Sequence, residues 1–412
     1  MIRFGVVGVG GYGAVWRQVL EPLEERGIAR IAAATDGNAA LLAALAPTLQ
    51  ARGTRVFASV DALLAEGRAE IDVVGLPVAI ASHAPLTVRA LDAGYNVLVE
   101  KPAAATVQDL LAMQAAERRA QRWCAVDYQY LYSPVTPWVL NKLTDGSLGA
   151  LREARVRIDW PRAVAYYQRN AWAGRVKVGD AWVLDGPATN AVAHHLAHLI
   201  YWGSLGQAGL ECIEAVRAEL YRAKPIESYD TSYLELRLTN GVRVLHIASH
   251  AVQAAHEPEA LLLCERGRIT WYSSADCVRA QYADGREEQF TPNDGLTLNE
   301  RTFVQVAELA AGRQPAPVCG LREAGPQVLA VNLAFESSGG VRPIGAKYAY
   351  EVAAHDGSSL VAVHGMEEAL ACAFEQGRSF AEQGLPWAQA GEWVSASDYR
   401  RFPRHPRLLA LG

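Results

Sequence analysis

Three glycines near the N-terminus have the spacing of a phosphate-binding turn, Gly8-x-Gly10-x-x-Gly13. They follow an apolar run that predicts a buried strand and precede a stretch with helical periodicity. In such a turn the first glycine permits the tight bend, the second lets the backbone approach a pyrophosphate, and the third brings helix and strand together. The helix N-terminus supplies amide donors. The pattern therefore predicts a dinucleotide site, which includes the intervening Gly11 and Tyr12.

Asp36 closes the next apolar run, close to the ~20-residue offset at which a carboxylate binds the ribose hydroxyls. A carboxylate there repels a 2′-phosphate, and no arginine directly follows it. We therefore predict NAD as the cofactor, with NADP less favoured. A glycine turn that binds some other ligand is the alternative, and FAD is a further one that nothing downstream supports.

The elements that position these residues alternate between strand and helix up to about residue 126. Strand-like runs are expected at residues 2–7, 29–35, 54–58, 71–76, 96–99 and 123–126. Strands that alternate with helices predict a doubly wound parallel sheet, so residues 1–126 are expected to form an α/β Rossmann domain.

Longer alternating segments follow, and an Asn-Gly pair at residues 240–241 predicts a hairpin between two of them. Residues 127–344 are therefore expected to form an α+β domain with a large, mostly antiparallel, open sheet. Residues 345–412 are an extension of unknown role, with one clear helix over residues 366–383. A chain of 412 residues is long enough for two cores.

Several segments resemble, in order, motifs of the glucose–fructose oxidoreductase/inositol dehydrogenase (Gfo/Idh/MocA) family. They are Val74-Gly-Leu-Pro77 through His83, Glu100-Lys101-Pro102, Tyr166-Tyr167 through Trp172-Ala-Gly174, Asn190-Ala-Val-Ala-His194, and the helix from Gly325 to Ser338. The resemblance covers residues 2 to about 344. It implies NAD-dependent oxidation of a sugar, polyol or sugar acid.

The resemblance also implies roles for individual residues. Lys101 would orient the substrate hydroxyl and His194 would act as acid/base. A histidine with a pKa near 6.5 suits proton removal at neutral pH, and a lysine stabilises negative charge that develops on the reacting oxygen. Lys101 also stands at the carboxyl edge of the predicted sheet, where open α/β folds bind ligands. His195 and His198 are alternative candidates for the acid/base role. A buried structural histidine is the alternative interpretation of His194.

The candidate sites follow from these matches. The cofactor candidates are Gly8, Gly10, Gly11, Tyr12, Gly13, Asp36, Pro77, His83, Glu100 and Lys101. The substrate candidates are Tyr167, Arg169, Trp172 and His195. The catalytic candidates are Lys101, His194 and Asn190.

Asn190 departs from the family pattern, in which aspartate commonly stands four residues before the histidine. Residues four apart lie one helical turn from each other, so Asn190 and His194 are expected to meet. An asparagine orients an imidazole by hydrogen bonding but does not stabilise an imidazolium by charge. The segment Asp127-Tyr-Gln-Tyr130 also lacks the arginine that members often carry there.

Two other patterns have competing interpretations. His194 and His198 have a spacing that binds zinc, but no cysteine or carboxylate cluster completes a site, so no metal is predicted. The stretch from Trp160 to Arg175 interleaves aromatic residues with arginines. It would stack on a pyranose and pair with a carboxylate or phosphate, or form a structural or subunit contact.

Three functions remain open. The leading hypothesis is reversible oxidation of a secondary hydroxyl on a carbohydrate-like substrate with NAD. The second is a redox-neutral, NAD-dependent glycoside hydrolase, and the third is a non-enzymatic regulator that senses NAD or a sugar. The net charge of -5 gives no sign of a nucleic-acid or membrane partner. Widely spaced cysteines, the lack of a long apolar stretch and an N-terminus that enters a strand at once favour a cytoplasmic protein. By resemblance, we expect a homodimer or homotetramer.

Overall fold

The computed structural model describes residues 1–353 and 357–409. It divides into two compact units. The first comprises Met1–Ala104, Gln108–Ser133 and Asn293–Ala324, and the second comprises Ala105–Val107, Pro134–Pro292 and Gly325–Gly412. The boundaries predicted from the sequence place residues 293–324 in the second domain, whereas the structure groups them with the first.

The first unit is built on a six-stranded parallel sheet with the order β3-β2-β1-β4-β5-β6. This is the strand order of a Rossmann fold, so the predicted fold class is confirmed. Its strands and helices are β1 (Ile2–Val7), α1 (Gly13–Glu25), β2 (Ala29–Thr35), α2 (Ala39–Ala51), β3 (Arg55–Val56), α3 (Val60–Glu66), β4 (Val73–Leu76), α4 (Ile80–Asp92), β5 (Asn96–Glu100), α5 (Val107–Ala120), β6 (Cys124–Asp127) and α9 (Leu298–Ala310).

Helix α9 joins this unit through an aromatic cluster. The Phe303 ring lies edge-on to Trp16 at 4.9 Å and to Phe4 at 5.6 Å between centroids. All three side chains are buried, and the neighbouring Thr302 hydroxyl donates to Asp127 at 2.8 Å. Burial of such rings is worth several kcal/mol, which explains why a segment distant in sequence completes the domain.

The second unit is built on a ten-stranded sheet with the order β16-β15-β14-β13-β7-β12-β11-β10-β17, and β20 also pairs with β10. Its strands are β7 (Leu151–Asp159), β10 (Ile213–Arg222), β11 (Thr231–Leu238), β12 (Arg243–Ser249), β13 (His256–Cys264), β14 (Gly267–Tyr272), β15 (Cys277–Tyr282), β16 (Glu287–Phe290), β17 (Arg342–Pro343) and β20 (Val394–Ser395). Only β7–β12 and β10–β17 pair in parallel, so the predicted large, mostly antiparallel sheet is confirmed.

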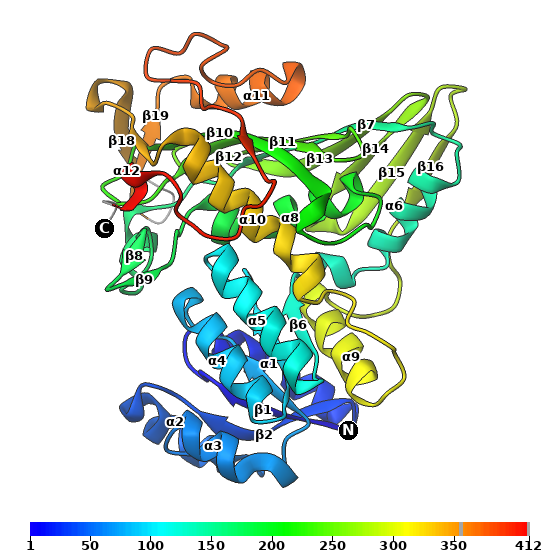
Figure 1. Ribbon diagram of the computed structural model, residues 1–412, viewed down its shortest axis with the longest axis vertical. Coiled ribbons are helices and arrows are strands. Elements are labelled where there is room, and N and C mark those ends of the chain that lie inside the picture. The colour runs from blue at the N-terminus through cyan, green and yellow to red at the C-terminus, as the bar shows by residue number, and fades with distance from the viewer. Residues whose placement is uncertain (354–356, 410–412) are drawn as a thin grey trace. The chain divides into compact units, whose positions relative to one another are not determined.

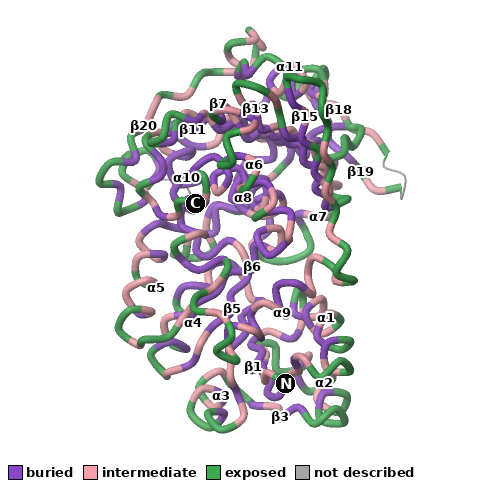
Figure 2. Tube along the Cα trace, turned by 90° about the vertical axis from the view of Figure 1, so that its right-hand side faces the viewer, coloured by how far each residue is buried: buried purple, intermediate pink, exposed green. Residues whose placement is uncertain are grey.

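Helices and two small hairpins complete this unit. They are α6 (Val135–Thr144), α7 (Val164–Gln168), the hairpin β8 (Lys177–Val178) and β9 (Ala181–Trp182), the π-helix η3 (Pro187–Ala191), α8 (Ala193–Gly203), α10 (Leu321–Ser338), the hairpin β18 (Ala349–Ala353) and β19 (Ser359–Val363), α11 (Met366–Gln376) and α12 (Pro406–Leu409). Helices α8 and α10 lie on one face of the sheet, and α11 packs on the opposite face over β7 and β12 (Figure 1). The strands beneath them are buried for most of their length (Figure 2).

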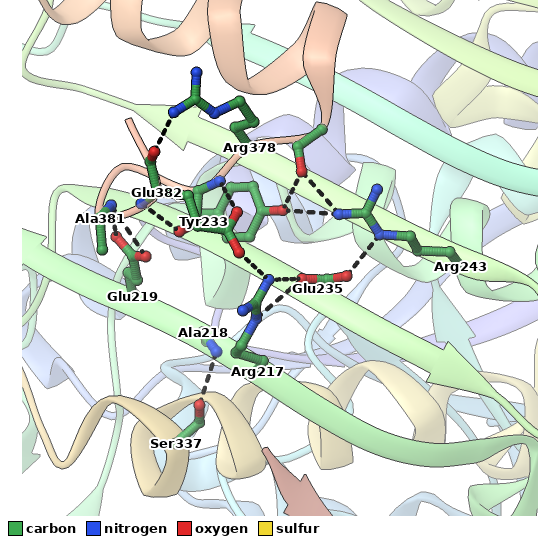
Figure 3. A network of polar contacts seen from close by, with 12 residues as sticks. Arg217, Ala218, Glu219, Tyr233, Glu235, Arg243, Ser337, Arg378, Ala381 and Glu382 are labelled. Atoms are coloured by element: carbon green, nitrogen blue, oxygen red, sulfur yellow. Dashed lines mark hydrogen bonds and ion pairs between the residues drawn. The ribbon is translucent and has the colours of Figure 1, made fainter. Parts of the chain in front are cut away.

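The C-terminal extension folds back onto the sheet of the second unit. Buried residues of α11 and the loop after it pack on β10, β11 and β12; they include Met366, Leu370, Ala373 and Phe380. Polar contacts surround this core, and Glu235 accepts hydrogen bonds from both Arg217 and Arg243 (Figure 3). The extension is therefore part of the second domain's packing.

The predicted helix over residues 366–383 is too long. Helix α11 ends at Gln376 because Gly377 adopts a left-handed conformation with φ +66° and its amide donates back to Ala373. Glycine tolerates that conformation at a helix C-terminus better than other residues. The Asn240-Gly241 turn does connect β11 and β12, as predicted.

No helix in the described part of the chain is long and apolar enough to cross a membrane.

Candidate functional site

The glycine turn has the backbone geometry that its spacing predicts. Gly8 has φ +91°, and a Cβ atom at Gly13 would lie 1.8 Å from the Gly8 carbonyl oxygen. Only glycine fits at that position, because the obstacle is backbone. Pro77, after β4, lies against the same turn, with its carbonyl oxygen 3.3 Å from a Cβ built at Gly8.

Asp36, at the end of β2, holds this turn in place. Its Oδ2 accepts a hydrogen bond from the Gly10 amide at 2.9 Å, and its Oδ1 accepts one from the Asn38 amide at 2.8 Å. Each carboxylate oxygen has two lone pairs, so both retain capacity for a hydroxyl donor. A turn that opens helix α1, with a carboxylate beside it, fits the pyrophosphate and ribose of a dinucleotide.

Two buried carboxyl groups lie beside each other at the carboxyl edge of this sheet. Glu100 ends β5, Asp127 ends β6, and the two residues are register partners. Glu100 accepts from the Trp16 indole at 2.8 Å and from the Lys101 amide at 3.1 Å. Burial raises the pKa of both carboxyl groups, and the charge of Asp127 raises that of Glu100 further.

Lys101 follows Glu100 directly and is partly buried. Its ammonium group lowers the pKa of both carboxyl groups and thus opposes the effect of burial. Lys101 therefore lies at the carboxyl edge of the sheet, as the sequence predicts, next to groups that respond to its charge. Its contacts with cofactor and substrate stay predictions.

His83 has a structural place in the same region. Its Nδ1 lies 2.7 Å from the Pro102 carbonyl oxygen and its Nε2 lies 3.0 Å from that of Val78. Burial lowers the pKa of His83 to about 4, so at neutral pH the ring carries one N–H and donates to one of the two carbonyls. The ring thus links the loops that follow β4 and β5. Its contact with a cofactor stays a prediction.

In the second unit, Asn190 lies in the π-helix η3 and His194 in α8, with Val192 between them at φ −125°. The spacing predicts that the two residues share one α-helical turn, but in the structure they do not. The wider turn arises because the Val192 amide donates to Pro187, five residues back. Such π turns are frequent at functional sites.

Asp185 supplies a carboxylate that the sequence analysis missed. The Asn190 side-chain amide donates to Asp185 Oδ1 at 2.9 Å, and the Gly174 amide donates to Asp185 Oδ2 at 2.7 Å. Asp185 is 3% exposed. Position 190 lacks the carboxylate of the family pattern, but Asp185 supplies a carboxylate that is hydrogen-bonded directly to Asn190. A search upstream of Asn190 for the missing acid would have found it.

The three neighbouring histidines have different surroundings. His194 is partly buried, whereas His195 and His198 are buried in the core. His195 Nε2 lies 2.9 Å from the Ser273 hydroxyl, and burial lowers the pKa of His195 to about 3. His198 Nε2 lies 2.9 Å from the Thr136 hydroxyl. Of the three, only His194 is not fully buried. Its role as acid/base and a substrate contact of His195 stay predictions.

The loop that was expected to bind substrate is internally ordered. The Arg169 guanidinium lies over the Tyr166 ring at 3.8 Å and 5.2 Å from the centre of the Trp172 ring. The Tyr167 hydroxyl lies 2.8 Å from His250 Nδ1, and the sequence analysis did not single out this histidine. The Arg169 guanidinium thus packs on aromatic neighbours, and Tyr167 forms a buried hydrogen-bonded pair with His250.

No group of three or more metal-binding side chains that could hold an ion occurs among the described residues. Lys101 belongs to the first compact unit, and Asn190 and His194 belong to the second.

The fold and the glycine turn define a two-domain, dinucleotide-binding protein. Residues 2–128 match the model of an oxidoreductase family with an NAD-binding Rossmann fold. For the N-terminal domain, this match confirms the resemblance to the Gfo/Idh/MocA family and NAD as the cofactor type.

Two curated relatives are similar over part of their length. An uncharacterised oxidoreductase of Synechocystis is 26% identical over 197 residues, which cover 45% of this chain and 50% of the relative. The dTDP-3,4-didehydro-2,6-dideoxy-alpha-D-glucose 3-reductase of Streptomyces violaceoruber is 35% identical over 92 residues, 22% of this chain and 26% of that protein. The chain thus matches half or less of the length of these relatives.

Among solved structures, the WlbA dehydrogenase of Bordetella pertussis, in complex with NADH and UDP-GlcNAcA, has the same fold with a TM-score of 0.66. It is 22% identical, and the match covers 82% of this chain and 96% of that one.

Proposed function

We propose that this protein transfers a hydride between a secondary hydroxyl of a sugar, polyol or sugar acid and NAD. The observation that carries the proposal is the glycine turn held by Asp36 in the domain whose sheet also presents Lys101 at its carboxyl edge. The names of the similar proteins support it, since one is a reductase of a dTDP-linked sugar and another is a dehydrogenase in complex with NADH and UDP-GlcNAcA.

Each residue has a defined part in this reaction. NAD, when bound, accepts or supplies the hydride. Asp36 would accept hydrogen bonds from the ribose hydroxyls of the cofactor. His194 would take the proton of the substrate hydroxyl, and Lys101 would stabilise the charge on that oxygen. Asn190, fixed by Asp185, is a positioning residue for His194.

The first test is NADH fluorescence after NAD and the full chain are mixed with a panel of sugars, polyols and uronic acids. We expect a rise with one class of substrate. Lys101→Ala should lower turnover of that substrate by about 100-fold or more, as expected for a group that stabilises developing charge. Unchanged turnover in Lys101→Ala would overturn the assigned role.

Cofactor preference is tested at Asp36. The wild type should bind NADH at least about tenfold more tightly than NADPH, because the carboxylate repels a 2′-phosphate. Asp36→Asn keeps a side-chain oxygen for the Gly10 amide and removes the charge. It should therefore reduce the ratio of NADH affinity to NADPH affinity, measured by fluorescence titration. A wild type that prefers NADPH would contradict the proposal.

The Tyr167–His250 pair favours one second candidate, redox-neutral hydrolysis of a glycoside. A phenol hydrogen-bonded to an imidazole is an acid/base pair that aglycone departure would use. Aglycone release from nitrophenyl glycosides without net NADH, lost in Tyr167→Phe, would support this reaction over the dehydrogenase. Binding of NAD and sugar without either turnover would support a sensor instead.

A further inference from the structure

The second unit contains a cavity of about 810 Å³. Three segments line it: α7 with the loop after it, the loop between β10 and β11, and residues 343–344. The volume is within the range of roughly 300–1,000 Å³ that small-molecule sites occupy, and is ample for a sugar with an additional group.

Backbone hydrogen bonds hold the walls of this cavity in position. The Gly174 carbonyl oxygen accepts from the amides of Glu227 at 3.0 Å and Ser228 at 2.9 Å. Gly174 has φ +70°, and a Cβ atom there would lie 2.9 Å from Tyr167 and from Ile226, so the two loops meet at a glycine. The cavity is therefore formed before any ligand binds, which lowers the entropic cost of binding.

Cations outnumber carboxylates among the lining residues. Among the described residues, the lining cations are Arg175, Arg222 and Lys224, and the lining carboxylate is that of Glu227. Glu227 pairs with Arg175 at 2.5 Å. Arg222 donates to the Ile226 carbonyl and Lys224 to the Val361 carbonyl, and a carbonyl neutralises no charge.

Lys224 is the most buried of these cations, at 3% exposure. Burial lowers its pKa, and the nearby Asp230 opposes that effect. Asp230 also accepts hydrogen bonds from the amides of Ala223 and Lys224, both at 2.8 Å, and from the Thr231 hydroxyl at 2.9 Å, and these bonds fix the loop that carries Lys224. A charged ammonium group on this wall is stabilised by an anion in the cavity.

Uncharged groups complete the lining. The Tyr167 ring, held through its hydroxyl by His250 at 2.8 Å, offers an aromatic surface, and Gln168 and Asn170 offer side-chain amides. Aromatic faces with a few fixed polar groups are typical of sites that bind a sugar ring.

We propose that this cavity binds a sugar through an anionic substituent, a carboxylate or a phosphate, and that Arg222 and Lys224 hold the anion. This inference rests on the proposed function, which it deepens by restricting the substrate to acidic sugars. Each charge-assisted hydrogen bond to the anion adds affinity that a neutral sugar lacks.

Isothermal titration calorimetry of the NAD-loaded full chain tests the proposal with three probes: glucuronate, glucose 1-phosphate and glucose. We expect glucose to bind at least about tenfold more weakly than one of the acidic probes, and competition between those two identifies the preferred anion. Equal affinity for glucose and both acids, or no binding of any probe, would overturn the proposal.

One variant that removes a positive charge and one that removes a negative charge distinguish an effect on anion binding from a loss of structure. Arg222→Gln should weaken binding of the acidic probe by about tenfold or more. Glu227→Gln should tighten that binding, because it removes the carboxylate found among the described lining residues. The exposed Arg152, paired with Glu265 elsewhere in the unit, gives the matched control Arg152→Gln, which should change nothing. If Arg222→Gln does not fold, Arg175→Gln replaces it.

A weaker affinity in Glu227→Gln would overturn the proposal even if Arg222→Gln behaves as expected. Binding of an acidic sugar without NADH formation would leave the cavity's ligand class standing and contradict the dehydrogenase, so the two failures are distinguishable.

Discussion

At the scale of single residues, the clearest consequence concerns Glu100 and Asp127. Burial raises the pKa of both, so in the folded protein they keep protons to a higher pH than in the unfolded chain. The folded state therefore binds more protons above the ordinary carboxyl pKa of roughly 4.3, and the free energy of unfolding falls as pH rises through that window.

Glu100→Gln tests this linkage. A neutral amide cannot lose a proton, so the variant's free energy of unfolding should decline less between about pH 5 and about pH 8 than that of the wild type. Urea unfolding at several pH values measures the slope. The slope, not the absolute stability, is decisive, because the amide also changes the hydrogen bonds to Trp16 and Lys101. Identical slopes would contradict the raised pKa of Glu100.

Asp185 and Asn190 allow a second residue-scale prediction. Asn190→Asp would place two carboxylates where an amide now donates at 2.9 Å, so it should cost about 1–3 kcal/mol and lower kcat. The double variant Asp185→Asn with Asn190→Asp restores a donor and an acceptor and should recover stability. Thermal unfolding and turnover of these two variants and of Asp185→Asn alone form the cycle. An Asn190→Asp protein as stable as the wild type would show that the contact contributes little.

At the scale of elements, sequence periodicity predicted the first domain well because each parallel strand is short, apolar and bounded by turns. The strands of the second half were harder to predict. Residues 256–290 form β13 to β16, yet most outward positions of β14 and β15 are polar, which weakens the apolar signal there. Helix α9 could not be assigned to the first domain either, since the Phe303 contact with Trp16 depends on tertiary structure.

The candidate site was predictable where chemistry depends on local spacing, as in the glycine turn and Lys101. It was not predictable where partners are distant in sequence. His250 meets Tyr167 across 83 positions, and Asp185 was overlooked because the family pattern directs attention to residue 190.

The charge network under the C-terminal extension gives an element-scale prediction. Glu235 is 6% exposed and accepts from Arg217 at 2.6 Å and from Arg243 at 2.6 Å (Figure 3). Glu235→Gln removes the charge that both guanidinium groups share, and should lower the free energy of unfolding by about 1–3 kcal/mol. Glu265→Gln, at an exposed pair with Arg152, is the control and should leave the urea midpoint unchanged. Equal midpoints for all three proteins would mean that the network adds no stability.

At the scale of the whole molecule, the extension bears on self-association. A dimer or tetramer is expected by resemblance, through the face of the large sheet. Helix α11 already covers that face over β7 and β12, where Arg155 donates to the carbonyls of Phe374 and Glu375. The same surface cannot contact α11 and a partner at once. Association through this face would therefore use the neighbouring strands, β13 to β16.

Leu261 in β13 tests that placement. Leu261 alternates with the buried Ala260 and Leu262, and it is partly exposed. It is the register partner of Arg155, so its side chain lies on the same face of the sheet that α11 covers over β7 and β12. We expect the full chain to be a dimer or tetramer by light scattering at micromolar concentration, and Leu261→Glu to shift it toward monomer, since a charge in an apolar contact costs several kcal/mol. Glu265→Gln serves again as the control. A wild type that is monomeric would refute the expected oligomer and would indicate that α11 takes the place of a partner subunit on this sheet.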